Sequence, residues 1–520
     1  MGEVKRKGKK FPIGVQTFSE IVSEDYLYVD KTEYVYNLVN DYKYVFLSRP
    51  RRFGKSLLSS TLMSYLEGRK ELFEGLKIMD LEEKWEQYAV LHFDFSKSKS
   101  FTAKEFSESV DKQLYMYEEI YERGEKDVGI SQRLEGLVTR AYEKTGCKVC
   151  IIIDEYDAPI LNVLYNKEEL ELVRQEVRKF YSPIKSLDPY LKFVFLTGIT
   201  KFSQLSIFSE LNNLKDISML PSYSAICGIS KEEIRESLMP YVKSMAEAKG
   251  IDVEEMFLQL AEYYDGYHFS KNGADMYNPF SLMNAFSDKD IQSYWFASAT
   301  PTFLVNYIKE HPIDETKLDS ITTLPIDDFN VSPEVSHESL PLLYQSGYLT
   351  IKDYDKETQL YTLGYPNKEV KMGFSKCLLN YYNGTQTGSS FVSKFYVSLK
   401  DDDIENALTL MQTYYSSIPY DLCNKEEKHF QTIFYLIFSL LGQYIQSEVK
   451  TAIGRADAVV KTPNSIYVFE MKVDKTAEIA LQQIDDKGYL IPYTTEGKHL
   501  VKVGLNFSSE TRTLQEWAIE

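Results

Sequence analysis

Almost continuously apolar segments alternate with helical patterns along roughly the first two hundred residues of the chain. The apolar segments are "YVFLSRP", "AVLHFDFS", "KVCIIIDEYD" and "LKFVFLTGIT". Stretches with helical periodicity, such as "SLLSSTLMSYLEG", separate them. Strands that are buried on both faces and joined by helices are typical of a parallel sheet. We therefore predict an α/β domain over residues 1–222, with helices on both faces of a parallel sheet.

The pattern changes after about Pro221 to acidic helices and an aromatic-rich irregular stretch. "KEEIRESLMPYVKSMAEAKG" has helical spacing with Gly250 as a stop signal, and "LPLLYQSGYLTIKDYDKETQLYTLGYPN" indicates a helix end followed by two short strands. We predict a helical lid and a winged element over residues 223–388. Helices including "LKDDDIENALTLMQTYYSSI" and "EEKHFQTIFYLIFSLLGQYI", then strands and a last helix, predict another α/β domain over residues 389–520.

The composition excludes several classes of protein. A chain of 520 residues with 43% hydrophobic and 26% charged residues is expected to form two to four globular domains. The net charge of -18 argues against a general coating of nucleic acid or membrane, although a local basic cleft stays compatible. No apolar run approaches the ~18 residues that span a bilayer. Five cysteines give no disulfide framework, and we expect a cytoplasmic protein.

The segment "SRPRRFGKSLL" follows the first predicted strand and begins a helix, as a phosphate-binding loop does. The predicted nucleotide-binding residues in it are Arg52, Phe53, Gly54, Lys55, Ser56 and Leu57. Lys55 would contact the β- and γ-phosphates, and Ser56 would ligate Mg²⁺. Arg49 occupies the first glycine position of the usual pattern, so the turn must accommodate a bulky residue. Arg51 and Arg52 are equally compatible with phosphates, nucleic acid or an acidic neighbour.

Polar residues end the following strands. Asp154 would hold Mg²⁺ through water, and Glu155 would orient or deprotonate the attacking water. Thr197 or Thr200 would sense the γ-phosphate, and Asp94 would line the same edge. Carboxylates at strand ends are also common as solvated charges. The order of these motifs on successive strands nevertheless favours an ATP site.

The strand "SIYVFEMKVDK" presents Glu470 and Lys472 on one face, where burial is costly unless the charges are paired or bound. Asp457 begins the preceding strand, "GRADAVV". Two carboxylates suit Mg²⁺ or Mn²⁺, and Lys472 would position or deprotonate a water or neutralise a phosphate. The alternative is an ordinary Glu and Lys on an exposed edge strand. The order helix–strand–strand–helix favours a metal-dependent nuclease site.

The two flanking helices add candidates to this site. Glu426 and Glu427 begin the preceding helix and could supply a further acidic ligand. Gln482 and Gln483 lie in the following helix, where their amides could contact the scissile phosphate or Glu470.

Segments along almost the whole chain share the pattern of a known family. They are "YVDKT", "RPRRFGKSL", "IIIDEYDAP", "FLTGITKFS", "YDGYHFS", "YNPFSLMNAF", "YWFASATPTFLV", "KEEKHFQTIFYLIFSLLG", "GRADAVV", "YVFEMKVDKTAEIALQQIDDKGY" and "VGLNF". The chain resembles bacterial and archaeal proteins that pair an AAA-ATPase-like domain with a C-terminal PD-(D/E)XK nuclease-superfamily domain. The resemblance implies a P-loop ATPase core of the additional-strand type, in which Arg49 is the usual loop residue, and a restriction-endonuclease-like domain. It places the nuclease pattern on Asp457, Glu470, Lys472, Gln483 and Glu427.

We predict an ATP-binding and ATP-hydrolysing protein fused to a Mg²⁺-dependent nuclease, with nucleic acid, and DNA first, as the expected substrate. Nucleotide state would control cleavage. A homo-oligomer is compatible with the sequence, and a membrane partner is not expected. The alternatives are an ATP-driven switch whose nuclease-like domain only binds nucleic acid or a partner protein, and a binding module in which neither site turns over. No chemistry follows for "YDGYHFS" and "YNPFS", and we interpret His92, His268, His429, Cys147 and Cys150 as packing residues.

Overall fold

The chain forms two compact units in the computed structural model, and each is described by itself. The first comprises residues 1–313 and 320–368, and the second comprises residues 314–319 and 369–520. The predicted division into three domains at residues 222 and 388 stays a prediction. The structure describes residues 8–520 except for 98–101, 165, 202–212, 299–303, 305–306, 309–310, 312, 333–337, 385–387, 420–426, 443–445 and 450–455.

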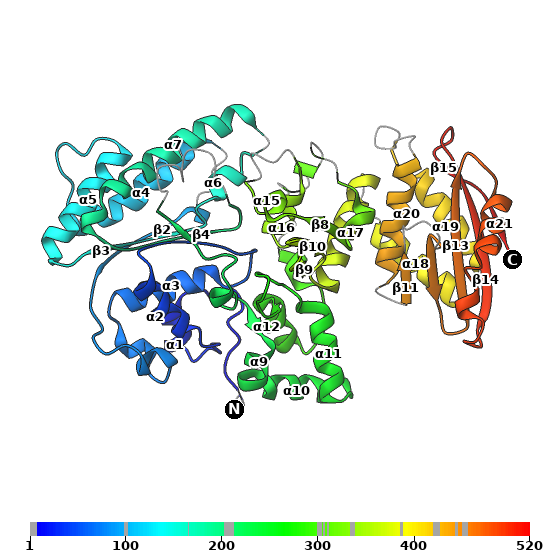
Figure 1. The fold of residues 1–520 in the computed structure, drawn as a ribbon, viewed down its shortest axis with the longest axis horizontal. Helices are drawn as coiled ribbons and strands as arrows, with labels where there is room; N and C mark the ends of the chain where they lie inside the picture. Colours follow the sequence, from blue (N-terminus) through cyan, green and yellow to red (C-terminus); the bar gives the residue numbers. More distant parts are fainter. Residues whose placement is uncertain are drawn as a thin grey trace, which may run out of the picture. The chain divides into compact units, whose positions relative to one another are not determined.

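A five-stranded parallel sheet forms the centre of the first unit, with strand order β2-β3-β4-β1-β5. Its strands are β1 (Tyr44–Ser48), β2 (Ala89–Asp94), β3 (Val149–Asp154), β4 (Leu191–Gly198) and β5 (Lys215–Asp216). One face carries α1 (Phe18–Ser23), α2 (Thr32–Asp41) and α3 (Lys55–Leu66), and the other carries α4 (Ala103–Tyr121), α5 (Ile130–Thr145) and α7 (Lys167–Ser186) (Figure 1). The predicted parallel sheet with helices on both faces is therefore confirmed.

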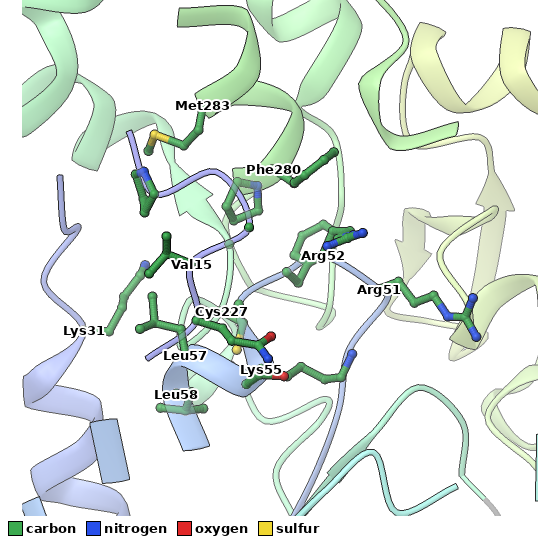
Figure 2. A pocket seen from close by; sticks show the side chains of 18 of the residues that line it. Val15, Lys31, Arg51, Arg52, Lys55, Leu57, Leu58, Cys227, Phe280 and Met283 are labelled. Carbon is green, nitrogen blue, oxygen red and sulfur yellow. The ribbon is translucent and has the colours of Figure 1, made fainter. Parts of the chain in front are cut away.

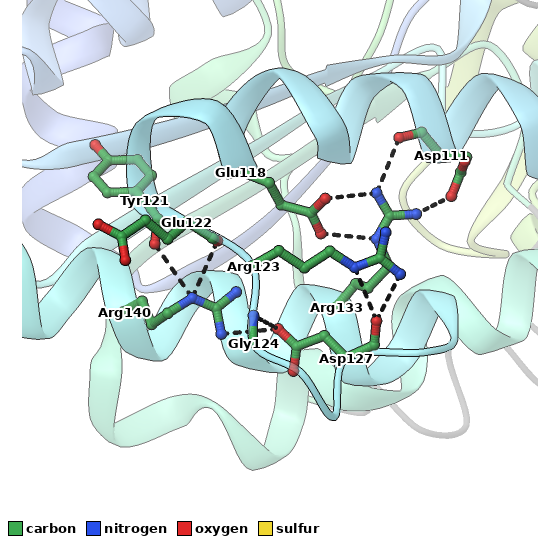
Figure 3. A network of polar contacts seen from close by, with 9 residues as sticks. All are labelled: Asp111, Glu118, Tyr121, Glu122, Arg123, Gly124, Asp127, Arg133 and Arg140. Carbon is green, nitrogen blue, oxygen red and sulfur yellow. Dashed lines mark hydrogen bonds and ion pairs between the residues drawn. The ribbon is translucent and has the colours of Figure 1, made fainter.

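Helices α4 and α5 form a hairpin that is tied together by buried charges (Figure 3). The Arg133 guanidinium on α5 donates to both carboxylate oxygens of Glu118 on α4, at 2.7 and 2.8 Å, and it also pairs with Asp111. The side chains of Arg133 and Glu118 are each only 3% exposed. Arg140 pairs with Asp127 at 2.8 Å near the turn of the hairpin. The hairpin is therefore fixed by ion pairs as well as by apolar packing.

The helical segment after the sheet begins with a short two-stranded ladder of β6 (Ile229–Ser230) and β7 (Met276–Tyr277). Its helices are α9 (Lys231–Glu233), α10 (Met239–Lys249), α11 (Val253–Tyr264), α12 (Pro279–Asp288) and α13 (Tyr294–Ser298). The single helix expected from "KEEIRESLMPYVKSMAEAKG" is instead interrupted by a π-helical turn over Ile234–Leu238. Pro240 follows this turn at the beginning of α10, where its missing N–H and its ring prevent a regular i→i−4 ladder.

The predicted winged element is present in the first unit. It is a three-stranded antiparallel sheet with order β8-β10-β9, and helix α16 (Leu340–Gln345) lies between β8 and β9 in the chain. Its strands are β8 (Ile321–Leu324), β9 (Thr350–Asp355) and β10 (Leu360–Gly364). The two strands expected from the sequence are β9 and β10, and the short helix α15 (Ile326–Phe329) lies between β8 and α16 in the chain.

The second unit contains a mixed five-stranded sheet with order β11-β12-β13-β14-β15, in which only β13 and β14 run parallel among the described pairs. Its strands are β11 (Gln446–Val449), β12 (Ala458–Lys461), β13 (Ser465–Val473), β14 (His499–Ser508) and β15 (Thr513–Ile519). Its helices are α17 (Lys368–Asn383), α18 (Gly388–Lys400), α19 (Ile404–Ser416), α20 (Glu427–Leu441) and α21 (Ala477–Lys487). Helix α21 covers one face of the sheet, and α18, α19 and α20 lie on the other (Figure 1).

The helix expected from "LKDDDIENALTLMQTYYSSI" begins later than predicted, because α18 ends at Lys400 and Asp403 caps α19 by accepting the Asn406 N–H. Throughout the described residues, no helix has the length and apolar character needed to cross a bilayer. This α/β domain with a mixed sheet confirms the fold class predicted for the C-terminal part.

Candidate functional site

The loop between β1 and α3 contains two residues with left-handed backbone angles, and only one of them is glycine. Gly54 caps α3 at φ 92°, and the non-glycine Arg52 also lies in the left-handed region at φ 67°. The Lys55 ammonium donates to the carbonyl oxygens of Arg49 and Pro50, each at 3.2 Å, and pairs with Glu155 at 3.3 Å. The loop thus curls around the lysine that was predicted to contact phosphates.

Arg49, at the position of the usual first glycine, binds backbone carbonyl groups with its side chain. Its guanidinium donates to the carbonyl oxygens of Ser48 at 2.9 Å, Ser218 at 2.7 Å and Tyr223 at 3.1 Å. It is buried, and its positive charge is spread over these carbonyl dipoles. A bulky residue is therefore accommodated here because it binds backbone outside the turn.

The carboxylates at the ends of the sheet strands converge next to this loop. Asp154 accepts a hydrogen bond from Ser56, and it lies in register with Asp94 on β2. Burial and the nearby Glu155 carboxylate raise the pKa of Asp154 to about 7. A divalent cation would favour the ionised form of this carboxyl, so Ser56 and Asp154 fit the predicted Mg²⁺ site.

A cavity of about 740 Å³ lies in front of the loop (Figure 2). The six predicted residues of the loop, Arg52 to Leu57, line it together with Glu155, whereas the predicted Asp154 and Thr197 are not among its lining residues. The opposite wall comes from α12, where Asn278 caps the helix and Phe280 and Met283 face the cavity. The Arg52 guanidinium lies 4.7 Å from the ring centre of Phe280. "YNPFS", to which we assigned no chemistry, thus begins the helix that closes the cavity.

The two threonines that were predicted to sense the γ-phosphate both donate their hydroxyl groups to other groups of the protein. Thr197 donates its hydroxyl to the carbonyl oxygen of Leu47 at 2.9 Å, and Thr200 donates to Asp157 at 2.7 Å. Their role toward nucleotide stays a prediction. Asp157, which sequence reasoning left without a role, is fully buried, and its Oδ2 also accepts the N–H groups of Ile199 and Thr200, at 3.0 and 2.6 Å. In the sequence, Asp157 is marked only by its place as the second aspartate of "DEYD".

The second constellation lies on the α21 face of the second unit. Glu470 and Lys472 share a face of β13, and their side chains pair at 2.8 Å. Asp457, directly before β12, accepts the N–H of Met471 at 2.8 Å. Gln483 on α21 donates its amide to Oε1 of Glu470. The structure therefore brings together the four residues that the strand and helix patterns had proposed.

Burial disfavours the ionised forms of both carboxyl groups in this cluster. Burial and the neighbouring Glu470 raise the pKa of Asp457 to about 7. Burial likewise raises the pKa of Glu470, against the hydrogen bond from Lys472. Oε2 of Glu470 is buried and has no hydrogen-bond partner within the described residues. An unpartnered carboxylate oxygen beside a second carboxylate is what a hard cation would bind, so the donor set fits Mg²⁺ or Mn²⁺.

The remaining candidates are less directly involved. Glu427 begins α20 and raises the pKa of Asp457 through its charge, and its own carboxylate accepts the Gln431 amide at 3.1 Å. Gln482 donates to Asp486 at 3.3 Å rather than to Glu470, and Glu426 lies outside the described residues. In the described part of the chain, no three His, Cys, Asp or Glu side chains converge to hold a metal ion. Water and phosphate oxygens would have to complete the coordination at either site.

Both units match known protein families. Residues 12–208 match the family described as "Predicted AAA-ATPase", and residues 425–517 match the PD-(D/E)XK nuclease superfamily. The chain belongs to a family of proteins that join these two domains. A particular relative, from Azotobacter chroococcum mcd 1, is described as an uncharacterized protein in the vnfD 5′ region. It is 34% identical, over 98% of this chain and 99% of its own length.

These matches confirm the resemblance that the motifs predicted. The chain joins an AAA-ATPase-like domain to a domain of the PD-(D/E)XK nuclease superfamily. The first class points to the use of a nucleotide, and the second points to the use of a divalent metal.

Proposed function

We propose that this protein is an ATPase whose nucleotide state controls a metal-dependent nuclease that cleaves DNA phosphodiester bonds. The observation that carries the proposal is the buried cluster of Asp457, Glu470 and Lys472, in which Lys472 pairs with Oε1 of Glu470 and Oε2 has no hydrogen-bond partner among the described residues. A purely structural Glu–Lys pair would not require a second buried carboxylate beside it, because that arrangement is costly without a cation.

At the nuclease site, Asp457 and Glu470 would hold the cation between them. A bound divalent cation supplies an acidified water and stabilises charge that develops on the phosphate. Gln483 donates to Oε1 of Glu470, and Oε2, which has no hydrogen-bond partner among the described residues, would ligate the cation. The Lys472 ammonium, 2.8 Å from Glu470, would position the attacking water or neutralise the phosphate oxygens.

At the ATP site, phosphate would compete for Lys55. Its ammonium pairs with Glu155 at 3.3 Å and binds loop carbonyls, and phosphate oxygens would draw it away from the carboxylate. Glu155 would then be released to orient or deprotonate the attacking water. Ser56 and Asp154 would hold the accompanying Mg²⁺. Binding and the release of the catalytic carboxylate would therefore be a single event.

The test is cleavage of plasmid and single-stranded DNA in Mg²⁺ or Mn²⁺, with and without ATP. We expect wild type to cut, and Lys472→Ala and Asp457→Ala to lose cutting while they retain ATP hydrolysis. A Lys55→Ala variant should remove any dependence of cutting on ATP. DNA and RNA that both stay intact with wild type would overturn the nuclease assignment and favour an ATP-driven switch that only binds. Equal cutting by wild type with and without ATP, or cutting by Lys55→Ala that is undiminished relative to wild type with ATP, would overturn nucleotide control.

A further inference from the structure

Aromatic side chains from a distant part of the first unit pack on the phosphate loop. Phe53, the residue before Gly54, is buried against Tyr267 and Phe269 of "YDGYHFS". The ring centres lie 4.6 Å and 5.3 Å apart, and both pairs meet edge to face, the favoured geometry for aromatic rings. This segment lies between α11 and β7, far from the loop in sequence.

The same segment also contacts the arginine that replaces the usual first glycine. The guanidinium of Arg49 lies 4.2 Å from the ring centre of Phe269. A cation over an aromatic face is attracted by the ring quadrupole, and more strongly when both groups are buried. Phe269 therefore touches the loop at both Arg49 and Phe53.

Backbone contacts complete the cradle around the loop. The N–H of Gly228 donates to the carbonyl oxygen of Phe53, and the Trp295 indole N–H donates to that of Arg51, each at 3.2 Å. Gly347 approaches the loop so closely that a β-carbon there would lie 2.6 Å from Cβ of Pro50. The outer side of the loop is thus held by groups from the helical segment and the winged element.

The loop needs such support because its conformation is unfavourable by itself. Arg52 lies at φ 67°, a region that residues with a side chain rarely adopt unless their surroundings impose it. In a loop rich in glycine this turn would cost little. Here the sequence offers arginine and phenylalanine instead, so contacts from outside must select the conformation.

We propose that Tyr267 and Phe269 are positioning residues for nucleotide binding. They hold Phe53 and Arg49 so that the loop presents its amide groups and Lys55 to the phosphates. The inference rests on the proposed ATP binding. It assigns a role to "YDGYHFS", none of whose residues is among those that line the cavity in front of the loop. The conformation of this loop is therefore set in part by a segment that lies far from it in sequence.

The test compares Phe269→Leu and Tyr267→Leu with two controls in the full chain. Tyr267→Phe keeps the ring that packs on Phe53. Phe286→Leu removes a buried ring from the neighbouring helical cluster, where it packs on Phe11 and Tyr241 rather than on the loop. Three quantities are measured: the Kd of Mg·ATP, the melting temperature, and hydrogen exchange of the amides of residues 49–57 without nucleotide.

We expect both Phe269→Leu and Tyr267→Leu to raise the Kd roughly tenfold and to speed exchange in the loop. Tyr267→Phe should stay close to wild type, and Phe286→Leu should lower the melting temperature with the Kd and the loop exchange unchanged. Equal Kd values for wild type, Phe269→Leu and Tyr267→Leu, or an equal loss of affinity in Phe286→Leu, would overturn the inference. If wild type binds no ATP, the proposed function fails. Loop exchange then decides the inference alone, and unchanged exchange in Phe269→Leu overturns it.

Discussion

Asp154 and Asp457 are buried carboxyl groups whose pKa values are both raised to about 7, mainly by desolvation and then by a neighbouring glutamate. Each lies beside a group that was proposed as a partner in binding a cation, Ser56 in one case and Glu470 in the other. Near neutral pH these groups lie close to the midpoint of their titration. Cation binding at either site should therefore release protons and strengthen as pH rises.

Asp457→Asn should stabilise the protein at pH 8 in the absence of divalent cations. The folded-state pKa of Asp457 is raised to about 7, so the folded state binds the proton more tightly than the unfolded state does. The free energy of unfolding therefore falls as pH rises from about 4 to about 7. Asparagine avoids this penalty, and its amide oxygen still accepts the Met471 N–H. Calorimetry should show a melting temperature higher by roughly 2 °C or more at pH 8, with a smaller difference at pH 5. A lower melting temperature for the variant at pH 8 would contradict the assignment.

Glu155→Gln should separate ATP binding from ATP hydrolysis. Glutamine cannot accept a proton from water, so turnover should fall roughly 100-fold or more. Lys55 keeps its bonds to the carbonyls of Arg49 and Pro50, so the loop and the nucleotide affinity should persist. Phosphate release and nucleotide affinity are the two measurements. An exposed substitution of the same chemistry on α7, Glu168→Gln, provides the control, and unchanged turnover in Glu155→Gln would remove this residue from the mechanism.

Individual site residues were predictable where chemistry and spacing coincide. The motifs "FGKS", "IIIDE" and "FEMK" can be picked out from the sequence alone, because charged residues at strand ends or in apolar strands need a partner. Asp157 was missed, because its partners are backbone N–H groups on another strand that no local pattern reveals. The choice between Gln482 and Gln483 likewise depends on which side of α21 faces β13.

At the scale of elements, close approach between α21 and β14 sets the geometry of the nuclease-like site. Gly504 lies opposite Glu470 in the parallel β13–β14 pair, and a methyl group there would overlap the carbonyl oxygen of Ala477 at the start of α21. Gly504→Ala should displace α21, and with it Gln483, from Glu470. We expect metal-dependent cleavage to fall on the order of 100-fold, while ATP hydrolysis serves as the internal control and stays unchanged. Cleavage at the wild-type rate would show that the position of α21 is not critical.

The α4–α5 hairpin depends on a buried ion pair (Figure 3). Glu118→Ala would leave the Arg133 guanidinium buried with only the carboxylate and carbonyl of Asp111 for contact. We expect the free energy of unfolding of the first unit to fall by about 3 kcal/mol or more. The matched double variant Glu118→Leu/Arg133→Met should recover most of this loss, because it removes both charges. Urea denaturation gives the stability of the single and the double variant, and hydrogen exchange in α5 is the local readout. Equal stability of Glu118→Ala and wild type would contradict this role of the ion pair.

Elements were predictable in proportion to their length. The long apolar strands β1 to β4 confirm the pattern, because burial on both faces leaves a continuous signal. β5 spans two residues and carries no such signal. The interruptions at Pro240 and at "DDD" moved helix boundaries that periodicity alone had run together.

At the scale of the whole molecule, the second unit includes a short piece of chain from far upstream. Asp319 pairs with Lys371 at 2.8 Å and accepts the hydroxyl of Tyr435 on α20 at 2.7 Å, and buried Glu315 accepts the hydroxyl of Tyr382. Lys371 and Tyr382 lie on α17 and Tyr435 lies on α20, so this short segment contacts both helices, and α20 begins with Glu427.

Replacing these anchors should weaken the second unit selectively. Glu315→Ala/Asp319→Ala leaves the two tyrosine hydroxyls without their carboxylates, and the free energy of unfolding of this unit should fall by about 2 kcal/mol or more. Hydrogen exchange should rise in α20 and stay unchanged in β3. A rise in both, or in neither, would show that residues 314–319 do not stabilise the second unit by themselves.

The chain passes between the two units three times, at residues 313/314, 319/320 and 368/369. A gene rearrangement with one breakpoint therefore cannot transfer a complete nuclease-like unit, because its six-residue anchor is encoded upstream, between parts of the ATPase-like unit. During synthesis, the same anchor leaves the ribosome before its partner helices exist, so the second unit is completed only after the whole first unit has been made. The two units are thus encoded by interleaved segments of one gene, and the second unit is completed after the first.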